Sequence, residues 1–236
     1  MTEVSIVIPL LNEAARLPTL LASLAPWRPR AEVIAVDGGS ADGSLEAMRS
    51  IGWVRCLASI PGRAHQMNVG AAAATGDALL FLHADVTLPP TALDDVRAAL
   101  ADPGVVGGRF DVRLDSPRPV YRLVETLMNL RSRRTGIWTG DQAIFVRRDV
   151  FRRLGGYPEI PLMEDVEFTR RLKRAGPGAC LRARVVASAR KWEREGPIRT
   201  ILLMWGLRFL YWVGVPPARL HRWYYRRPAA AADRPA

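Results

Sequence analysis

The chain has 236 residues, of which 49% are hydrophobic and 24% charged, and its formal net charge is +11. This composition is typical of a globular protein and excludes a disordered or fibrous chain, and the length is enough to bury a hydrophobic core. The two cysteines, Cys56 and Cys180, are too few for a disulfide scaffold, so we expect a reducing, cytoplasmic setting. Residues 1–15 lack a basic segment followed by an apolar core, and we therefore expect no secretory signal peptide.

The positive charge is concentrated in the second half of the chain. Residues 1–112 hold 8 Arg and Lys against 12 Asp and Glu, a net charge of −4, whereas residues 113–236 hold 26 against 11, a net charge of +15. Since 32 of the 34 basic residues are arginine, a bias in base composition explains the choice of Arg over Lys, but not this asymmetry. It indicates an anionic partner, which is a nucleic acid, a membrane surface or a phosphorylated ligand.

In the first half, apolar runs alternate with helical patterns. Apolar runs predict buried strands at Val4–Pro9, Glu32–Val36, Trp53–Ala58 and Asp77–His83. Helices are predicted at Glu13–Leu24, Ala41–Ser50, Ala64–Thr75 and Thr91–Leu100. This alternation predicts an α/β fold with a mostly parallel central sheet flanked by helices. Ligands of such sheets bind beyond the carboxyl ends of the strands, where we expect the functional site.

The second half is less regular. Strands are predicted at Val105–Val112, Thr139–Val146 and Leu181–Val186, and helices at Val120–Arg131, Asp149–Leu154 and Met163–Arg174. The chain has no internal repeat and no linker that would separate two independent domains. We therefore predict one domain.

Polar residues follow three of the predicted strands. Asn12-Glu13 follows the first, the Asp37–Ser40 segment the second and the His83–Asp85 segment the fourth. Because the carboxyl ends of parallel strands meet at one edge, these groups predict a nucleotide site, with Asp37 near the base or ribose and Asp85 near a metal ion. A single carboxylate at such a position is more often a helix N-cap, but polar residues at three strand ends favour a binding site.

Several common catalytic motifs are missing from the sequence. The segment Pro9–Glu13 stands where a dinucleotide-binding protein would have G-x-G-x-x-G, and there is no P-loop. The H-E-x-x-H and G-x-S-x-G motifs are also absent. These absences argue against a dehydrogenase, a P-loop NTPase, a zinc peptidase and a serine hydrolase.

Six motifs occur in an order typical of one enzyme family. They are Val4–Pro9 with Asn12-Glu13, Val36–Asp42, Asn68–Asp77, Phe81–Asp85, Gly155–Tyr157 and Glu164–Glu167. With these motifs the chain resembles the family-2 glycosyltransferases with a GT-A fold, over nearly its whole length. More narrowly, Gly62–Asn68 and Thr139–Gln142 are similar to a bacterial subgroup of radical-SAM- and selenodomain-associated glycosyltransferases, which includes proteins of arsenosugar biosynthesis. Some of its members carry labels that link them to carotenoid glycosylation.

The resemblance implies an inverting transfer of one sugar from a nucleotide-sugar, by analogy a UDP-sugar, to a hydroxyl or carboxyl acceptor. The acceptor would be lipid-like, for example of carotenoid type, or a small metabolite. Processive members of the family carry a Q-x-x-R-W box, and the Ala187–Trp192 segment lacks its Gln. This difference favours the transfer of a single sugar over polymerisation.

The same resemblance assigns roles to individual residues. It makes Asp165 the catalytic base and Asp85 the carboxylate that holds Mg²⁺ or Mn²⁺ against the donor diphosphate. His83 stands at the first position of the family's D-x-D motif and is an additional candidate ligand. The alternative role of Glu164 and Asp165 is to complement the N-terminus of the helix that follows them.

Two groups of residues are candidates for contact with the substrates. The donor or nucleotide candidates are Pro9, Asn12, Glu13, Asp37, Gly39, Arg63, Gln66, Asn68 and Asp85. The acceptor or diphosphate candidates are Asp141, Gln142, Glu164, Arg190, Lys191 and Trp192. Arg63 follows a Pro-Gly turn at a helix start, where a guanidinium beside backbone N–H groups suits a diphosphate. Gln66 and Asn68 either bind the nucleotide or only decorate their helix.

The C-terminal segment, residues 198–227, is amphipathic and rich in aromatic residues. Its apolar part, Ile198–Val215, approaches the length of a bilayer span but contains Arg199 and Arg208. Arginines mixed with aromatic residues predict peripheral contact with an anionic membrane, at the inner face of the cell membrane, and the alternative is a helix that closes the core. The rest of the chain is predicted to form a GT-A domain at residues 1–197, with a nucleotide-binding half at 1–112 and an acceptor half at 113–197. Residues 228–236 are predicted to be a disordered tail.

Two other functions match parts of the pattern. A nucleotidyltransferase has a similar α/β nucleotide fold, but it would require a Gly-rich and basic first loop, which Pro9–Glu13 is not. A nucleic-acid-binding module would explain the basic half, but the strand ends are acidic and no binding motif is present. We therefore expect no nucleic-acid partner.

Overall fold

The computed structural model describes residues 3–225. The predicted tail at 228–236 and the last two residues of the 198–227 segment lie outside the described residues.

The first half forms the parallel part of the sheet. Its strands are β1 (Val4–Leu10), β2 (Glu32–Asp37), β3 (Arg55–Ala58) and β4 (Ala78–Phe81). Its helices are α1 (Leu17–Leu24), α2 (Ser44–Arg49), α3 (Arg63–Ala73) and α4 (Ala92–Leu100), with single 3-10 turns at Ala14–Arg16 and Ala25–Trp27. The pairs β1–β2, β2–β3 and β1–β4 are all parallel, as predicted.

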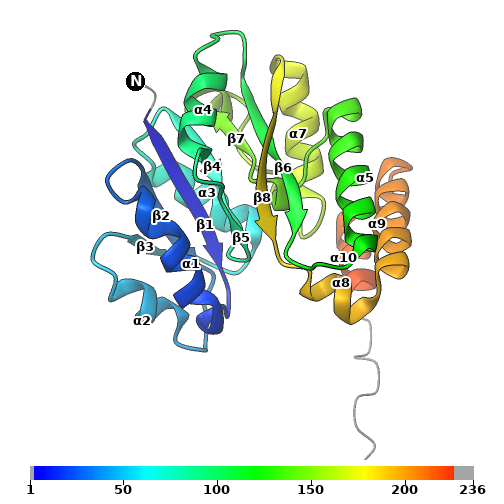
Figure 1. Cartoon of the computed structure of the whole chain (residues 1–236), viewed down its shortest axis with the longest axis horizontal. Helices are drawn as coiled ribbons and strands as arrows, with labels where there is room; N and C mark the ends of the chain where they lie inside the picture. Colours follow the sequence, from blue (N-terminus) through cyan, green and yellow to red (C-terminus); the bar gives the residue numbers. More distant parts are fainter. Residues whose placement is uncertain (1–2, 226–236) are drawn as a thin grey trace, which may run out of the picture.

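The remaining four strands extend this sheet and run in both directions. They are the short β5 (Val86–Thr87), then β6 (Gly107–Leu114), β7 (Phe145–Arg147) and β8 (Gly178–Ala187). The strand order is β3-β2-β1-β4-β7-β6-β8-β5 (Figure 1). β7 runs antiparallel to both β4 and β6, β5 runs antiparallel to β8, and β6 and β8 are parallel. The prediction of a mostly parallel sheet flanked by helices is confirmed.

Helices cover both faces of the sheet, which is why its central strands are apolar throughout. Ile6 and Ile8 of β1 point to a core that includes α1, α4 and the long helix α5 (Pro119–Thr135), while Val7 points to the opposite core. That second core includes α3, α6 (Arg148–Arg153) and α7 (Glu164–Ala175). Gly70 lets α3 lie close to the sheet, because a methyl group there would come within 2.4 Å of Val7.

One predicted strand is mostly a turn. Thr139–Val146 contains a 3-10 turn at Gly140–Gln142, and the strand begins only at Phe145. Two hydrogen bonds between Thr139 and Gln142 close the turn: the Gln142 N–H donates to the backbone O of Thr139 at 2.9 Å, and the side-chain oxygen of Gln142 accepts the Thr139 N–H at 3.4 Å. The polar residues of this segment therefore form a turn, and the strand starts later than predicted.

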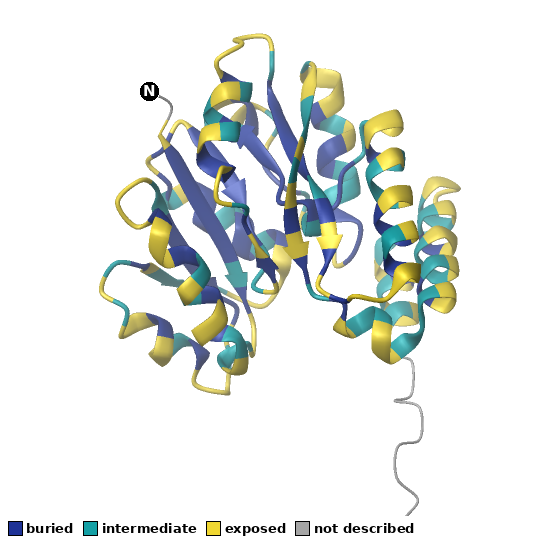
Figure 2. Cartoon of the chain, viewed as in Figure 1, coloured by how far each residue is buried: buried dark blue, intermediate teal, exposed yellow. Residues whose placement is uncertain are grey.

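The C-terminal segment forms three helices at one end of the sheet. They are α8 (Arg190–Glu195), α9 (Pro197–Trp212) and α10 (Pro217–Tyr225), and α9 lies beside α5 (Figure 1). Leu207 of α9 and Leu220 of α10 are buried against Leu162 and Met163, which precede α7. The helices thus close the core, while α9 also has an exposed apolar face (Figure 2). Within residues 3–225 no helix is long and apolar enough to cross a bilayer.

Candidate active site

Two cavities meet beyond the carboxyl ends of β1 and β4. The larger, of about 820 Å³, is lined by the loops after β1 and β4, the start of α3 and the segment before α7, and also by α10. The smaller, of about 290 Å³, lies between the start of α7, α5 and α9. Three residues, Arg63, His83 and Asp85, line both cavities. The larger volume is in the range that binds nucleotide-sized ligands.

The predicted site residues divide into three groups. The larger cavity is lined by Pro9, Glu13, Arg63, Gln66, His83, Asp85 and Glu164. The smaller is lined by Arg63, His83, Asp85, Asp141, Asp165, Lys191 and Trp192. Those that line neither cavity are Asn12, Asp37, Gly39, Asn68, Gln142 and Arg190. The segments after β4 and at the start of α7 thus border the same two cavities.

The loops after β1 and β2 are joined to each other beside the larger cavity. Asn12, in a left-handed conformation with φ of 54°, donates its N–H to Ser40 Oγ at 2.8 Å and accepts the N–H of Ala41 at 2.9 Å. The N–H of Glu13 donates to Ser44 Oγ and that of Ala14 to the carboxylate of Asp42, each at 2.9 Å. The side chain of Asn12 therefore acts within the protein and not in the cavity.

Asp37 is buried at the end of β2 and points into its own loop. Its carboxylate accepts the N–H groups of Gly39 and Ser40 at 2.9 Å and the Ser40 hydroxyl at 2.5 Å. Gly39 has a φ of 91°, a conformation that favours glycine. In this conformation Asp37 and Gly39 shape the loop beside the larger cavity, and their predicted contact with the donor stays a prediction.

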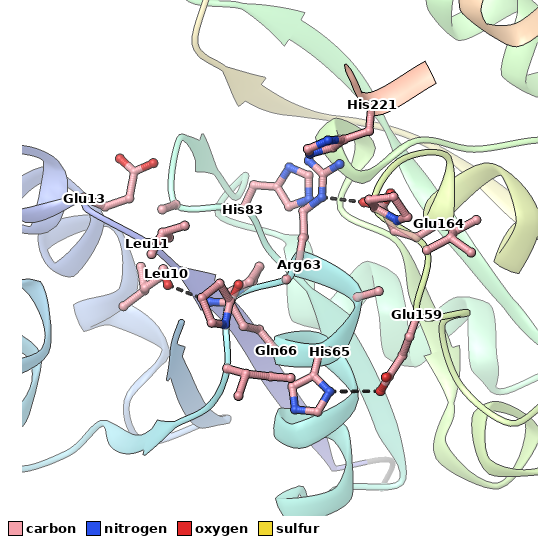
Figure 3. Close-up of a pocket in the computed structure, with 18 of the residues that line it drawn as sticks. Leu10, Leu11, Glu13, Arg63, His65, Gln66, His83, Glu159, Glu164 and His221 are labelled. Carbon is pink, nitrogen blue, oxygen red and sulfur yellow. Dashed lines mark hydrogen bonds and ion pairs between the residues drawn. The ribbon is translucent and has the colours of Figure 1, made fainter. Parts of the chain in front are cut away.

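Two amide side chains of α3 bind backbone groups. Gln66 is buried, and its Nε2 donates to the carbonyls of Leu10 at 2.6 Å and Val36 at 2.9 Å (Figure 3). Asn68 accepts the N–H of Tyr157 at 2.9 Å and donates to its carbonyl at 2.8 Å. Of the two alternatives for these residues, the geometry favours a structural role, in which Gln66 fixes the ends of β1 and β2 and Asn68 fixes the loop after α6.

Arg63 and Glu164 connect α3 to α7 across the larger cavity. The Nε of Arg63 donates to Glu164 Oε1 at 2.5 Å, and Glu164 is only 2% exposed (Figure 3). Burial raises the pKa of Glu164 and the nearby Asp165 raises it further, while Arg63 opposes both. The second carboxylate oxygen, Oε2, is buried and has no hydrogen-bond partner within residues 3–225. A buried acceptor of this kind favours a ligand that donates a hydrogen bond.

His83 lies where the two cavities meet, against Gly140. A methyl group on Gly140 would come within 2.3 Å of the His83 ring, so only glycine permits this approach. The pKa of His83 is lowered to about 3, mainly by burial and to a lesser degree by the guanidinium of Arg63. The ring is therefore neutral, and one of its nitrogens carries a free lone pair.

Asp165 is held at the start of α7 by two backbone groups. Its Oδ2 accepts the N–H of Gly140 at 3.0 Å, and its Oδ1 accepts the N–H of Val166 at 2.7 Å. A carboxylate at a helix start gains from the helix dipole, which is the alternative role expected from the sequence. It also lines the smaller cavity, next to His83 and Asp85, so this placement suits a general base as well.

The residues around Asp85 determine whether a divalent cation fits. The Asp85 carboxylate is 41% exposed and lies 3.8 Å from Arg16, which also contacts Glu13 at 3.1 Å. Burial raises the pKa of Glu13, Arg16 lowers it, and the charge of Asp85 raises it. Within residues 3–225 no three His, Cys, Asp or Glu side chains are grouped to hold a metal ion. Mg²⁺ takes one or two carboxylates and completes its shell with water and phosphate oxygens, so the single exposed carboxylate of Asp85 is compatible with such an ion next to a diphosphate.

The 3-10 turn after α5 separates two predicted acceptor residues. Asp141 lines the smaller cavity, and burial raises its pKa even though Thr139 donates a hydrogen bond to it. Gln142 is fully buried and donates to Ser132 Oγ at 3.0 Å. The predicted contact of Gln142 with a sugar or an acceptor is not supported by this placement, because its side chain belongs to the core.

Helix α8 brings two of its three predicted site residues to the smaller cavity. Lys191 lies over the ring of Tyr224, 3.8 Å from its centre, and both line the smaller cavity together with Trp192. Arg190 is exposed and lines neither cavity. The basic pair therefore splits, with Lys191 facing the site and Arg190 facing solvent.

Several residues that line the two cavities carry no sequence motif. His221 and Tyr225 of α10 line the larger cavity, as do His65 and Glu159, which pair at 2.9 Å. Arg131 of α5 and Arg208 of α9 line the smaller cavity. No local pattern marks these positions, because tertiary packing of distant segments brings them to the site.

Comparisons with known proteins agree with this architecture. The pre-mycofactocin glycosyltransferase of Mycobacterium tuberculosis is 31% identical over 192 residues, which cover 74% of this chain and 40% of that protein. The 4,4'-diaponeurosporenoate glycosyltransferase of Staphylococcus haemolyticus is 32% identical over 99 residues, 36% of this chain and 24% of that protein. The chain thus spans less than half the length of the curated relatives it matches.

Solved structures share the fold at low sequence identity. A mannosyltransferase from Pyrobaculum calidifontis in complex with GDP-Man and Mn²⁺ has a TM-score of 0.65 and 22% identity, covering 98% of this chain and 66% of that chain. Residues 1–349 of S. aureus TarS in complex with UDP-GlcNAc have a TM-score of 0.64 and 21% identity, covering 79% and 58%. These likenesses confirm the GT-A fold. Residues 5–155 match the family model described as glycosyl transferase family 2, and the chain therefore belongs to that family.

Proposed function

We propose that the chain is an inverting glycosyltransferase that moves one sugar from a nucleotide-sugar, with UDP as the expected nucleotide, to a hydroxyl or carboxyl acceptor. The observation that carries this proposal is the junction of the two cavities. A donor in the larger cavity and an acceptor in the smaller would meet at Arg63, His83 and Asp85, with the Asp165 carboxylate on the acceptor side. This arrangement holds two reactants next to one base.

In the proposed reaction, the acceptor oxygen attacks the anomeric carbon from the side opposite the diphosphate. Asp165 takes the proton of an acceptor hydroxyl, the new C–O bond forms, and the bond to the diphosphate breaks with its electron pair on the departing nucleoside diphosphate. A carboxylate acceptor would need no proton removal. Arg63 and the first N–H groups of α3 are placed to bind the negative charge of the diphosphate.

We also propose that Asp85, with His83 as an additional ligand, holds Mg²⁺ or Mn²⁺ at this junction. When bound, such an ion offsets the charge of the diphosphate. Support comes from the exposed carboxylate of Asp85 and the neutral ring of His83. A structural neighbour is known with GDP-Man and Mn²⁺.

We also propose a subgroup within the family and a type of acceptor for this chain. The Gly62–Asn68 and Thr139–Gln142 motifs support membership of the radical-SAM-associated, arsenosugar-type subgroup. The relatives include a 4,4'-diaponeurosporenoate glycosyltransferase, which supports an apolar acceptor of carotenoid type.

The protein would reach such an acceptor at a membrane surface. Five apolar side chains of α9 lie on one helical face and are 59–80% exposed: Ile198, Leu202, Trp205, Phe209 and Trp212. An exposed apolar helix face in a strongly basic half of the chain suits peripheral contact with an anionic bilayer. We expect Phe209→Ser with Trp212→Ser to abolish flotation with anionic liposomes, whereas Val186→Ser on β8 should not change it. If the protein as it stands does not float with such liposomes, this contact is refuted.

The proposed activity is tested with a panel of nucleotide-sugars. We expect one UDP-sugar to raise the thermal midpoint in the presence of Mn²⁺ or Mg²⁺, because a ligand that binds only the folded state stabilises it. The same donor should then be consumed with an acceptor, and the product should have the opposite anomeric configuration. Retained configuration would overturn the inverting mechanism, and stabilisation by nucleoside triphosphates alone would favour a nucleotidyltransferase.

A further inference from the structure

The smaller cavity continues as a groove between α5 and α9. Val124, Leu127 and Met128 of α5 form one wall, and Ile201, Met204 and Trp205 of α9 form the other. Asp165, Gly140 and His83 also line this cavity. A ligand that fills this groove would therefore have a long apolar body and would present one end to the candidate base.

The groove is bordered by exposed apolar side chains. Leu127 on α5 is 42% exposed and Trp205 on α9 is 60% exposed, and both line the smaller cavity. Both helices therefore show apolar surface to solvent at the place where they meet. An apolar chain that entered between them would cover part of this surface.

Two arginines line the groove from opposite walls, Arg131 from α5 and Arg208 from α9. The Nη1 of Arg131 donates to the carbonyl of Ile137 at 3.2 Å, but its Nη2 is buried and has no hydrogen-bond partner among the residues that the structure describes. The pKa of Arg131 is lowered to about 10, mainly by burial and to a lesser degree by the charge of Arg208. Two guanidinium groups that oppose each other in this way leave a site for an anion.

The nearby acidic residues only partly balance this pair. Asp141 already accepts a hydrogen bond from Thr139, and Asp165 is bound to the N–H groups of Gly140 and Val166. The buried donor of Arg131 thus has no acceptor from either carboxylate.

We propose that the α5–α9 groove binds the acceptor as an anionic amphiphile, with its apolar chain between the two helices and its carboxylate or phosphate on Arg131 and Arg208. This inference rests on the proposed function, since it names the acceptor class of the same site. It makes Arg131 and Arg208 the residues that select an acidic acceptor over a neutral one of the same length.

The test measures binding without any donor, so that it does not depend on catalysis. The probes are dodecanoate, dodecyl phosphate, dodecanol and inorganic phosphate, with each amphiphile below its micellar concentration. The readouts are titration calorimetry and the intrinsic tryptophan fluorescence, to which Trp192 and Trp205 in the groove contribute. We expect both acidic probes to bind about tenfold tighter than dodecanol. A preference for dodecanoate or for dodecyl phosphate identifies the acidic group.

Matched variants assign the effect to the two arginines. Arg208→Gln and Arg131→Gln should each lose the preference for acidic probes, whereas Arg199→Gln on the exposed side of α9 should keep it. If Arg131→Gln does not fold, the preference of Arg208→Gln for acidic probes still tests the inference. Equal affinity for dodecanol and dodecanoate, or an unchanged preference in Arg208→Gln, would overturn the inference. Inorganic phosphate that bound as tightly as dodecyl phosphate would also do so, because the apolar chain would then contribute nothing.

The donor is tested separately on the unaltered protein. If a nucleotide-sugar stabilises the protein while the acidic probes show no preference, the proposed function stands and this inference fails. If the probes bind as expected but no nucleotide-sugar binds or reacts, the proposed function fails.

Discussion

The carboxylate of Asp165 accepts a hydrogen bond from the backbone N–H of Gly140 at 3.0 Å. This contact joins the first turn of α7 to the turn that precedes β7. Because the His83 ring also lies close against Gly140, one backbone position contacts both the candidate base and one of the three residues that line both cavities. The position of the candidate base therefore depends on Gly140, a residue of the turn that has no side chain.

We expect Asp165→Asn to reduce transfer to a hydroxyl acceptor by about 10²- to 10⁴-fold, the usual contribution of a positioned base. The amide keeps an oxygen for the Gly140 N–H, so donor affinity should stay within about twofold. Single-turnover transfer and calorimetry measure the two quantities. Glu167→Gln in the same helical turn, whose side chain lines neither cavity, is the control. Unchanged turnover in the Asp165 variant would remove the assignment of the base.

We expect Asp85→Ala to weaken donor binding about tenfold or more in the presence of Mn²⁺ or Mg²⁺, because it removes the exposed carboxylate at the junction. With EDTA in place of the metal the variant and the unaltered protein should bind the donor alike. Calorimetric titrations under both conditions provide the comparison, and Asp149→Ala on α6 serves as the control. Equal affinities with metal present would exclude Asp85 from a metal site.

Gly140→Ala should impair the site through His83. The added methyl group would lie 2.3 Å from the ring, so the ring or the turn must move. We expect at least a tenfold loss of kcat/KM, since displaced groups of about 1 Å have effects of that size. Gly52→Ala is the matched control, because a methyl group there meets no atom within 4 Å among residues 3–225. Wild-type kinetics in Gly140→Ala would show that the approach of His83 has no functional role.

Glu32 provides a test of stability against pH. Its Oε2 accepts hydrogen bonds from Ser5 Oγ at 2.6 Å and from the N–H and hydroxyl of Thr75 at 2.9 and 3.0 Å. Burial alone would raise the pKa of Glu32, but these bonds and Arg55 outweigh it and lower the pKa. A pKa lowered in the fold adds stability above the pKa of the unfolded chain, and that stability is lost as pH falls through the folded value.

We therefore expect Glu32→Gln to lower the free energy of unfolding at pH 7 by about 1 kcal/mol. The difference from the unaltered protein should shrink toward pH 3, as the carboxyl group becomes protonated. Urea denaturation at both pH values measures it. A difference that stayed the same at the two pH values would mean that the ionised form of Glu32 contributes nothing.

The sequence predicted those parts of the fold that depend on local patterns. The four strands of the first half and the polar groups after them follow from apolar runs ended by Asn12, Asp37 and His83. The antiparallel insertion of β7 between β4 and β6 was not predicted, because strand direction depends on pairing partners that are distant in sequence.

The site itself could be predicted only in part. The family motifs located Arg63, Asp85 and Asp165 at the cavities, but they also included Asn68 and Gln142, whose amides bind other parts of the protein. A sequence pattern marks an amide without indicating which of its possible partners is nearest. The pairing of Arg131 with Arg208 across the groove could not be predicted, because the two residues lie on helices more than 60 residues apart in the sequence. Neither arginine stands out by itself in this arginine-rich chain.

The four hydrogen bonds between the loops after β1 and β2 have a consequence for the family's sequence variation. Residues 12–14 supply three of the donors, and Ser40, Asp42 and Ser44 supply their acceptors. A chimera that took only one of these loops from a relative would leave N–H groups without partners next to the larger cavity. The two segments should therefore be inherited and exchanged together, as a single module.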